Sequence, residues 1–486
     1  MPDFSTTDAE RTRDACYEVL REYQLPGLAI GVVEGDDIVY AESFGFAEIK
    51  RRREMSITHR QRIGSISKTM TALLIMSLVE QDRLRLDSKL VDLFPQLAFV
   101  GEGDSSSLTI QHLLTHSGGI GEAPTRALLD KPLAALWSDS PDLLPPEERY
   151  PDGIEVETDP GTKWAYANHG FGLLGDLLTR LEEKPLADLF RDRIFRPLAM
   201  RDSDIRDKPH HSLAPGYHRA ITDPERRARG GVDLWYSDEP AEDEVNLRGQ
   251  YIYIPVPAAG SVQSTVRDMA RYASVLLRRG EGLVEEQTFA TMVAAQWEPD
   301  PRLASVGLSF MRGSHFGVRS FGHGGGVSGG WNSEMSIFPE RNLAVLIHFN
   351  LDDESTGPAR SRLLQAVLDG SIAPPLDEPI DGALATQAAG TYEAEPGELT
   401  NTRIRWTTGR LTIAAEDDGL LLRSRRGAWT EGVPLRTPDP ADPTLLRVMD
   451  GSVEPVHLVL TRGEAGRVDG LLLDRCVRMV RATDPA

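Results

Sequence analysis

The sequence predicts an α/β fold, in which an antiparallel sheet is flanked by helices, followed by a small all-β barrel. Three observations support this prediction: a strand pair that leads into a buried helix, two apolar strands after a glycine-rich stretch, and short β segments beyond a proline-rich linker. We expect the first unit over residues 1–372, the linker over residues 373–383 and the barrel over residues 384–486.

The first elements are a helix, a strand pair and a second helix. Residues 7–23 are predicted to be helical, and the apolar segments 28–33 and 38–41 are predicted to form two strands around a tight turn. Residues 65–85 contain no Gly or Pro and are rich in good helix formers. Apolar side chains lie on nearly every face between residues 72 and 79, which indicates a helix packed on all sides.

Ser65 and Lys68 lie at the start of this helix. Because they are three residues apart, their side chains share one helix face. Burial should depress the pKa of the lysine, since desolvation penalises the charged form, and a neutral amine can accept the serine proton. The pair is therefore a candidate nucleophile with its base, although the same tetrapeptide pattern is common on exposed helices.

Residues 108–119 are predicted to form a short helix that Thr109 caps and glycines end. His112 and His116 are four residues apart on it, a spacing that could suggest a metal site. No third ligand is evident in the sequence, so we expect a structural role for both histidines and no metal or other cofactor.

Tyr166 and Asn168 occupy a turn just before another apolar helix. Loops that are held by scaffold on both sides often present catalytic groups, so both residues are candidates. The alternative is an aromatic side chain covering the core beside a capping Asn.

The stretch 321–330 is rich in glycine, which is entropically costly unless a close approach of the backbone requires it. A phosphate loop is excluded because residues 331–339 and 342–350 read as successive strands of one sheet. A glycine-lined strand edge beside Ser65 could supply a backbone N–H to an oxyanion, with His323 as a nearby polar group.

A helix over residues 355–369 closes the first unit. Beyond the linker, short segments recur between Gly, Asp and Pro turns and predict the barrel strands, among them residues 403–406, 419–422, 456–460 and 470–473. We find no catalytic grouping there and expect this domain to be separable from the chemistry.

Composition excludes several classes of protein. The 53 basic and 74 acidic residues give a net charge of −21, which argues against nucleic acid or an anionic membrane as the main partner. Cys16 and Cys476 form neither a disulfide framework nor a metal site. No signal peptide or apolar run long enough to span a membrane is evident, so we expect a cytoplasmic protein.

The motifs together resemble those of the penicillin-recognising serine hydrolases, the superfamily of class C β-lactamases and DD-peptidases that includes family VIII esterases and D-aminopeptidases. The resemblance covers about residues 10–370 and depends on three ordered motifs, Ser65-x-x-Lys68, Tyr166-x-Asn168 and His323-Gly324-Gly325. The C-terminal part resembles the lipocalin-like appendage of some members.

This resemblance implies a role for each residue. Ser65 would attack a carbonyl and form an acyl-enzyme, while Lys68 and Tyr166 would share the proton transfers. Asn168 would orient Lys68. The backbone N–H groups of Ser65 and Gly326 would form the oxyanion hole, and Gly324 and Gly325 would bind substrate.

His323 departs from the β-lactamases of this family, which usually carry Lys at its position. Since histidine is mostly neutral at pH 7, we expect esters, amides or D-amino-acid peptides rather than carboxylate-bearing β-lactams. The expected protein is a serine hydrolase acting on a small molecule or short peptide. The alternatives are an acyl-transferring thioesterase or cyclase, a β-lactamase, and a sensor that is acylated without turnover.

Overall fold

The computed structural model describes residues 4–482, except for 129–142, 206–207, 220–242, 244, 370–379, 417–418, 455, 464–465 and 474–476. Most of the expected linker, and Cys476, therefore lie outside the described residues. Cys16 is buried in the core. No helix in the described part of the chain is both long and apolar enough to cross a membrane.

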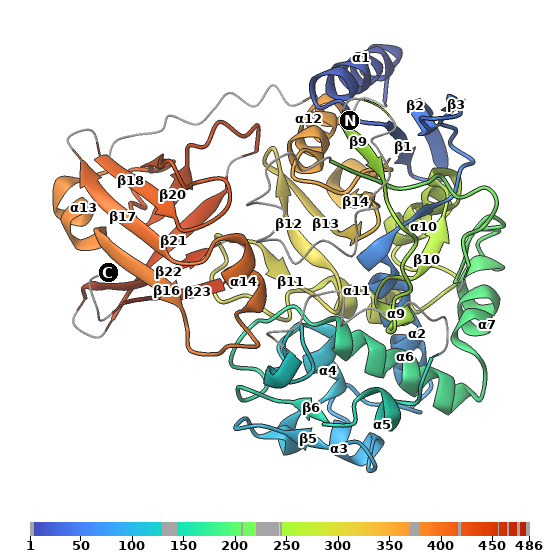
Figure 1. The fold of residues 1–486 in the computed structure, drawn as a ribbon, viewed down its shortest axis with the longest axis horizontal. Coiled ribbons are helices and arrows are strands. Elements are labelled where there is room, and N and C mark those ends of the chain that lie inside the picture. The colour runs from blue at the N-terminus through green and yellow to red at the C-terminus, as the bar shows by residue number, and fades with distance from the viewer. Residues whose placement is uncertain are drawn as a thin grey trace.

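An eight-stranded antiparallel sheet forms the centre of the first unit (Figure 1). Its spatial order is β11 (Ser305–Val306), β12 (Met311–His315), β13 (Val318–Val327), β14 (Trp331–Phe338), β15 (Leu343–Phe349), β1 (Gly27–Glu34), β2 (Asp37–Glu48) and β3 (Arg53–Glu54). The expected fold class is confirmed.

Helices cover both faces of this sheet because its central strands are apolar on both sides. All seven residues of β15 are buried, as are the first seven of β1. Leu28, Ile30 and Val32 pack with α1 (Thr6–Glu22) and α12 (Thr356–Leu368). The opposite face contributes Val33 and Leu346 to the core that contains α2 (Ser67–Glu80) and α10 (Val266–Leu277).

The predicted helix over residues 65–85 is shorter than expected. A 3₁₀ turn, η1 (Gly64–Ile66), precedes α2, and α2 ends at Glu80. The prediction was wrong at this end because Asp82 adopts a left-handed backbone with φ 53°, which no α-helix continues. Ten of the first eleven residues of α2, from Ser67, and Leu78 beyond them are among its buried residues, in agreement with a helix packed on all sides.

Further helices around α2 complete this half of the molecule. They include α3 (Leu90–Leu93), α4 (Ile110–Leu114), α5 (Pro146–Arg149), α6 (Asn168–Glu182), α7 (Leu186–Phe190), α9 (Pro257–Gly260) and α11 (Glu286–Val293). Thr109 caps α4 through the backbone N–H of His112, as the sequence predicts. Two small strands beside this region, β4 (Gln61–Arg62) and β7 (Asp204–Ile205), pair with β10 (Val262–Ser264).

The C-terminal unit is a closed eight-stranded barrel with its own hydrophobic core. Its strands are β16 (Gly390–Ala394), β17 (Leu411–Glu416), β18 (Gly419–Ser424), β19 (Val433–Arg436), β20 (Leu445–Val448), β21 (His457–Arg462), β22 (Val468–Leu473) and β23 (Val477–Arg481). Helix α13 (Gly382–Ala388) adds Leu384 and Ala388 to this core.

One predicted barrel strand is a helix instead. Residues 403–406 lie in α14 (Thr402–Thr407), on the side of the barrel that faces the first unit (Figure 1). Four residues that alternate between basic and apolar side chains are too few to distinguish the period of a strand from the period of a helix. Contacts with the first unit hold the preceding turn, and the backbone then continues as a helix from Asn401.

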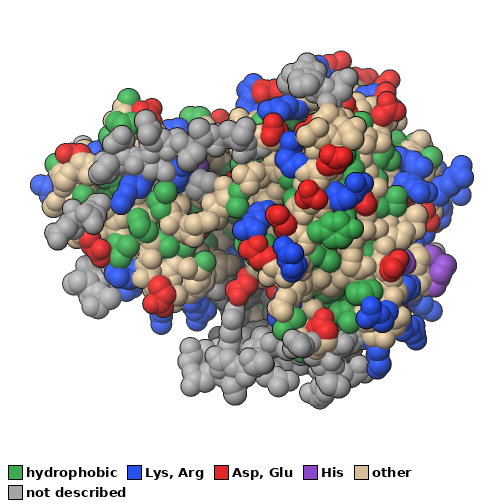
Figure 2. Space-filling model, turned by 90° about the horizontal axis from the view of Figure 1, so that it is seen from above, with side chains coloured by type: hydrophobic (Ala, Val, Ile, Leu, Met, Phe, Trp, Pro, Cys, Tyr) green, Lys and Arg blue, Asp and Glu red, His purple; other side chains and the backbone are tan. Residues whose placement is uncertain are grey.

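Basic and acidic side chains are interspersed on the face of the molecule that Figure 2 shows. The negative charge of the chain is thus not gathered into one acidic region on that face, which is the pattern of a solvated surface.

Candidate active site

A contact between two glycine-containing segments brings Ser65 to the edge of the sheet. The pairing of β12 with β13 ends at Gly322, so the rest of β13 faces η1. Gly64 has φ +52°, and a Cβ there would lie 2.8 Å from the backbone nitrogen of Gly326. A Cβ on Gly325 would lie 2.0 Å from the carbonyl oxygen of Ile63. Only glycine allows this approach, which sets Ser65 beside Gly326.

Lys68 is completely buried and makes three polar contacts. Its Nζ lies 2.9 Å from Ser65 Oγ, 2.7 Å from Asn168 Oδ1 and 2.8 Å from the carbonyl oxygen of Ala259. Burial, together with the positive charge of Arg403, lowers the pKa of Lys68 well below its usual value. The neutral amine donates its two N–H groups to the two carbonyl oxygens, and its lone pair then faces the Ser65 hydroxyl.

Asn168 is held in one orientation by a buried carboxylate. Its Nδ2 donates a 2.6 Å hydrogen bond to Glu122 Oε1, so its Oδ1 points toward Lys68. Burial alone would raise the pKa of Glu122, but the charge of Arg403 and hydrogen bonds from Arg403 and Asn168 lower it below its usual value. Glu122 is therefore an ionised acceptor.

Tyr166 is buried beside this group, in contact with four basic side chains. The His116 ring stacks on it at 4.1 Å between centroids. Arg403 Cζ lies 4.3 Å and Lys68 Nζ 4.9 Å from the centre of the phenol ring. The ring of His323 meets it edge-on at 6.2 Å. The structure thus brings all five expected catalytic side chains, Ser65, Lys68, Tyr166, Asn168 and His323, into one cluster.

His116 supports Tyr166, in line with the structural role expected of it. Its Nδ1 accepts a 3.2 Å hydrogen bond from the backbone N–H of Ala167, and its ring also packs on Phe171. Burial lowers the pKa of His116 well below its usual value, so the imidazole is neutral. No cluster of metal-ligating side chains occurs among the residues that the structure describes.

Sequence reasoning missed Glu122 and Arg403. Glu122 could have been noticed as an acidic residue within a run of small and apolar residues close to His116. No pattern in the sequence indicated Arg403, because it lies 281 residues from Glu122 in the chain. The C-terminal domain contributes Arg403 to this cluster, where it reaches Tyr166, and the separability of that domain from the chemistry stays a prediction.

We predict that Gly64→Ala abolishes turnover of p-nitrophenyl esters, because the added methyl group forces η1 away from β13 in an already left-handed backbone. Gly357→Ala is the matched control, since nothing lies within 4 Å of its added Cβ. It should retain wild-type kcat and change the free energy of unfolding by no more than about 1 kcal/mol. Equal kcat in both variants would contradict the claim that activity requires the close contact between η1 and β13.

We also predict that Lys68→Met and Tyr166→Phe each lower kcat about 100-fold or more while the melting temperature shows a folded protein, since each removes a proton-transfer group. Tyr40→Phe serves as the control. Tyr40 bonds Glu42 on a distant strand and should leave kcat unchanged. Near-normal turnover in Lys68→Met or Tyr166→Phe would remove that residue from the mechanism.

This chain is similar in sequence to known proteins of one family. The family described as Beta-lactamase matches residues 8–369. A D-aminopeptidase of Cereibacter sphaeroides is 25% identical over 473 residues, covering 95% of this chain and 81% of that protein. Penicillin-binding protein 4* of Bacillus subtilis is 25% identical over 404 residues, covering 78% of this chain and 82% of that protein.

Solved structures share the fold. An octameric penicillin-binding protein homologue from Pyrococcus abyssi superposes with a TM-score of 0.61 at 21% identity, over 98% of this chain and 100% of that one. The D-amino acid amidase of Ochrobactrum anthropi SV3, complexed with L-phenylalanine amide, superposes with a TM-score of 0.61 at 20% identity, over 74% of this chain and 99% of that one. With a family match over most of its length and the clustered Ser, Lys, Tyr and Asn side chains, this chain belongs to the beta-lactamase family.

Proposed function

We propose that the protein is a serine hydrolase that forms an acyl-enzyme on Ser65 and acts on amides of D-amino acids with a free amino group. The observation that carries the proposal is the 2.9 Å contact between Ser65 Oγ and the buried amine of Lys68. The names of the relatives, D-aminopeptidase and D-amino acid amidase, support this substrate class.

The reaction follows from the contacts of Lys68. As Ser65 Oγ attacks the substrate carbonyl, the lone pair of Lys68 accepts the hydroxyl proton. The cation that forms is stabilised by Asn168 Oδ1 and the carbonyl oxygen of Ala259. Tyr166, beside Lys68, passes a proton to the leaving amine, and water then hydrolyses the acyl-enzyme by the reverse transfers.

The backbone N–H groups of Ser65 and Gly326 are the proposed donors to the oxyanion. Such a donor commonly contributes about 3 kcal/mol to stabilising the transition state. The edge of β13 at Gly324 and Gly325 would pair with the substrate backbone, and His323 would border the same edge as a group without a fixed charge.

The charge beside Gly326 favours an ammonium group in the substrate. Asp352 Oδ1 lies 3.8 Å from the position of a Cβ on Gly326. Burial, opposed by a hydrogen bond from Asn332 and supported by the charge of Asp353, raises the pKa of Asp352 to about 7. An ammonium group would keep Asp352 ionised, whereas a substrate carboxylate would be repelled.

The test compares kcat/KM for D-phenylalanine amide, its L enantiomer, its N-acetyl derivative, p-nitrophenyl acetate and nitrocefin. The D-amide should be hydrolysed best among the amides, N-acetylation should cost about 10-fold or more, and Ser65→Ala should be inactive. A preference for nitrocefin would contradict the proposal. A single acyl group on Ser65 without turnover of any substrate would identify a sensor instead.

Asp352→Asn tests the ammonium site in the same assay. The variant should raise KM for D-phenylalanine amide and leave KM for p-nitrophenyl acetate unchanged. In the wild type, kcat/KM for the amide relative to the ester should rise as pH increases toward about 7, because Asp352 ionises, and should fall above about pH 8, because the substrate amine loses its proton. The substrate amine titrates in the same way in assays of the variant. An equal pH dependence of this kcat/KM ratio in both proteins would therefore exclude Asp352 as the ammonium site.

A further inference from the structure

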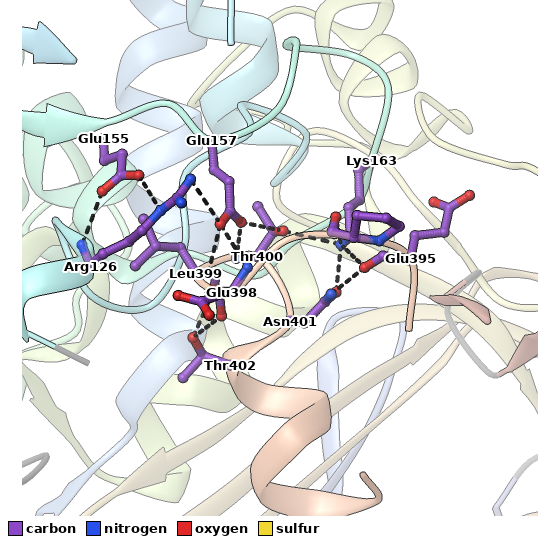
Figure 3. A network of polar contacts seen from close by, with 11 residues as sticks. Arg126, Glu155, Glu157, Lys163, Glu395, Glu398, Leu399, Thr400, Asn401 and Thr402 are labelled. Carbon is purple, nitrogen blue, oxygen red and sulfur yellow. Dashed lines mark hydrogen bonds and ion pairs between the residues drawn. The ribbon is translucent and has the colours of Figure 1, made fainter. Parts of the chain in front are cut away.

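The turn before α14 docks on the first unit through a buried carboxylate (Figure 3). Glu157 accepts hydrogen bonds from three successive backbone N–H groups, at 2.6 Å from Glu398, 3.2 Å from Leu399 and 2.9 Å from Thr400. Three such bonds fix the path of the backbone as well as its distance from the first unit.

Lys163 holds the same turn from the other side. Its Nζ donates to the carbonyl oxygens of Glu395 at 3.2 Å and Pro396 at 3.3 Å, and to Thr400 Oγ1 at 3.1 Å (Figure 3). Burial lowers the pKa of Lys163 to about 8, while Glu157 and Glu395 oppose that shift. Glu157 and Lys163 both lie in the chain segment just before Tyr166.

This docking places Arg403 in contact with Glu122. A Cβ on Gly121 would lie 2.3 Å from the carbonyl oxygen of Leu399, so the two backbones touch immediately before Glu122. Arg403 then contacts both carboxylate oxygens, with Nε 2.9 Å from Oε2 and Nη2 3.2 Å from Oε1. Such two-point contacts fix direction as well as charge.

We propose that Arg403 of the C-terminal domain is a positioning residue for the reaction, which acts through Glu122 and Asn168 to keep Lys68 aligned on Ser65. The inference rests on the proposed function of Ser65 and Lys68. It makes docking of the barrel a condition for full activity.

The alignment of Lys68 on Ser65 depends on which way the Asn168 amide points. An ionised carboxylate only accepts hydrogen bonds, so Glu122 requires the NH₂ group of Asn168 and leaves its oxygen for Lys68. A protonated Glu122 could donate to that oxygen instead and stabilise the flipped amide. The flipped NH₂ group would face the amine of Lys68 and compete with the Ser65 hydroxyl for its lone pair.

Arg403 is the group that keeps Glu122 ionised. The Glu122 side chain is 8% exposed, so without a cation its burial would favour the protonated form. The other titratable groups around this pair are Lys68, His116, Tyr166, His169 and His323. Among the described groups around Glu122, Arg403 alone carries a fixed positive charge, because burial lowers the pKa of Lys68, of His116 and of His169.

Arg403 is 49% exposed, so it also borders solvent, and a direct contact with substrate must be separated from an effect through Glu122. A double-mutant cycle does so. Arg403→Met should lower kcat about 10- to 100-fold with little change in KM. In the Glu122→Gln background, which has no carboxylate to protonate, the same substitution should cost no more than about twofold. An equal loss in both backgrounds would overturn the proposal.

The pH profile gives a second readout. In Arg403→Met, Glu122 loses its cation and its pKa rises, so the deficit in kcat relative to wild type should shrink as pH increases from about 6 to about 9. Arg403→Lys keeps the charge but not the two-point contact, so it should restore the wild-type pH profile and only part of kcat. A deficit that is constant with pH would indicate a merely structural role and contradict the proposal.

Arg302→Gln is the matched control. It removes another arginine contact between the two units, the 2.7 Å pair with Asp442, and touches no residue of the site. This variant should keep the wild-type pH profile.

Activity remaining in Ser65→Ala would refute the proposed function itself, whereas inactive Ser65→Ala with additive losses in the cycle would refute only the role of Arg403.

Discussion

The chemistry that we propose for this protein depends on the complete burial of one amine. Lys68 lies at the start of a helix packed on all sides, and its desolvation favours the neutral form that can accept a proton from Ser65. The two carbonyl oxygens that surround it then favour the cation that forms during the reaction. The same pocket therefore suits both protonation states, and each neighbouring element serves to maintain it.

Two kinds of constraint maintain that pocket. The first is steric: Gly64 and Gly325 lack the side chains that would separate η1 from the edge of β13. The second is electrostatic: Glu122 fixes the amide of Asn168, and Arg403 compensates the buried charge of Glu122. The steric contact lies within the first unit. The electrostatic one spans both units, because Arg403 of the C-terminal domain contacts Glu122 of the first unit.

Most of the fold and the central site could be predicted from the sequence, because their signals are local. The helix before Glu80, the strands around the glycine-rich stretch, and the spacing of Ser65 and Lys68 are all patterns within short windows. Glu122 and Arg403 could not be predicted, because their importance arises from a contact between distant segments. Residues 403–406 were predicted as a strand since their short alternation says nothing about the docking that precedes α14.

The most direct test of this account is the pH dependence of Ser65 phosphonylation by a fluorophosphonate, in which Ser65 Oγ displaces fluoride from phosphorus, followed by intact mass in wild type and in Ser65→Ala. The account predicts one adduct, located on the Ser65 peptide, whose rate of formation reaches half its maximum far below the ordinary lysine pKa of about 10.4. A rate that rises only near that value, or an adduct that persists in Ser65→Ala, would contradict the claim that a buried neutral Lys68 activates Ser65.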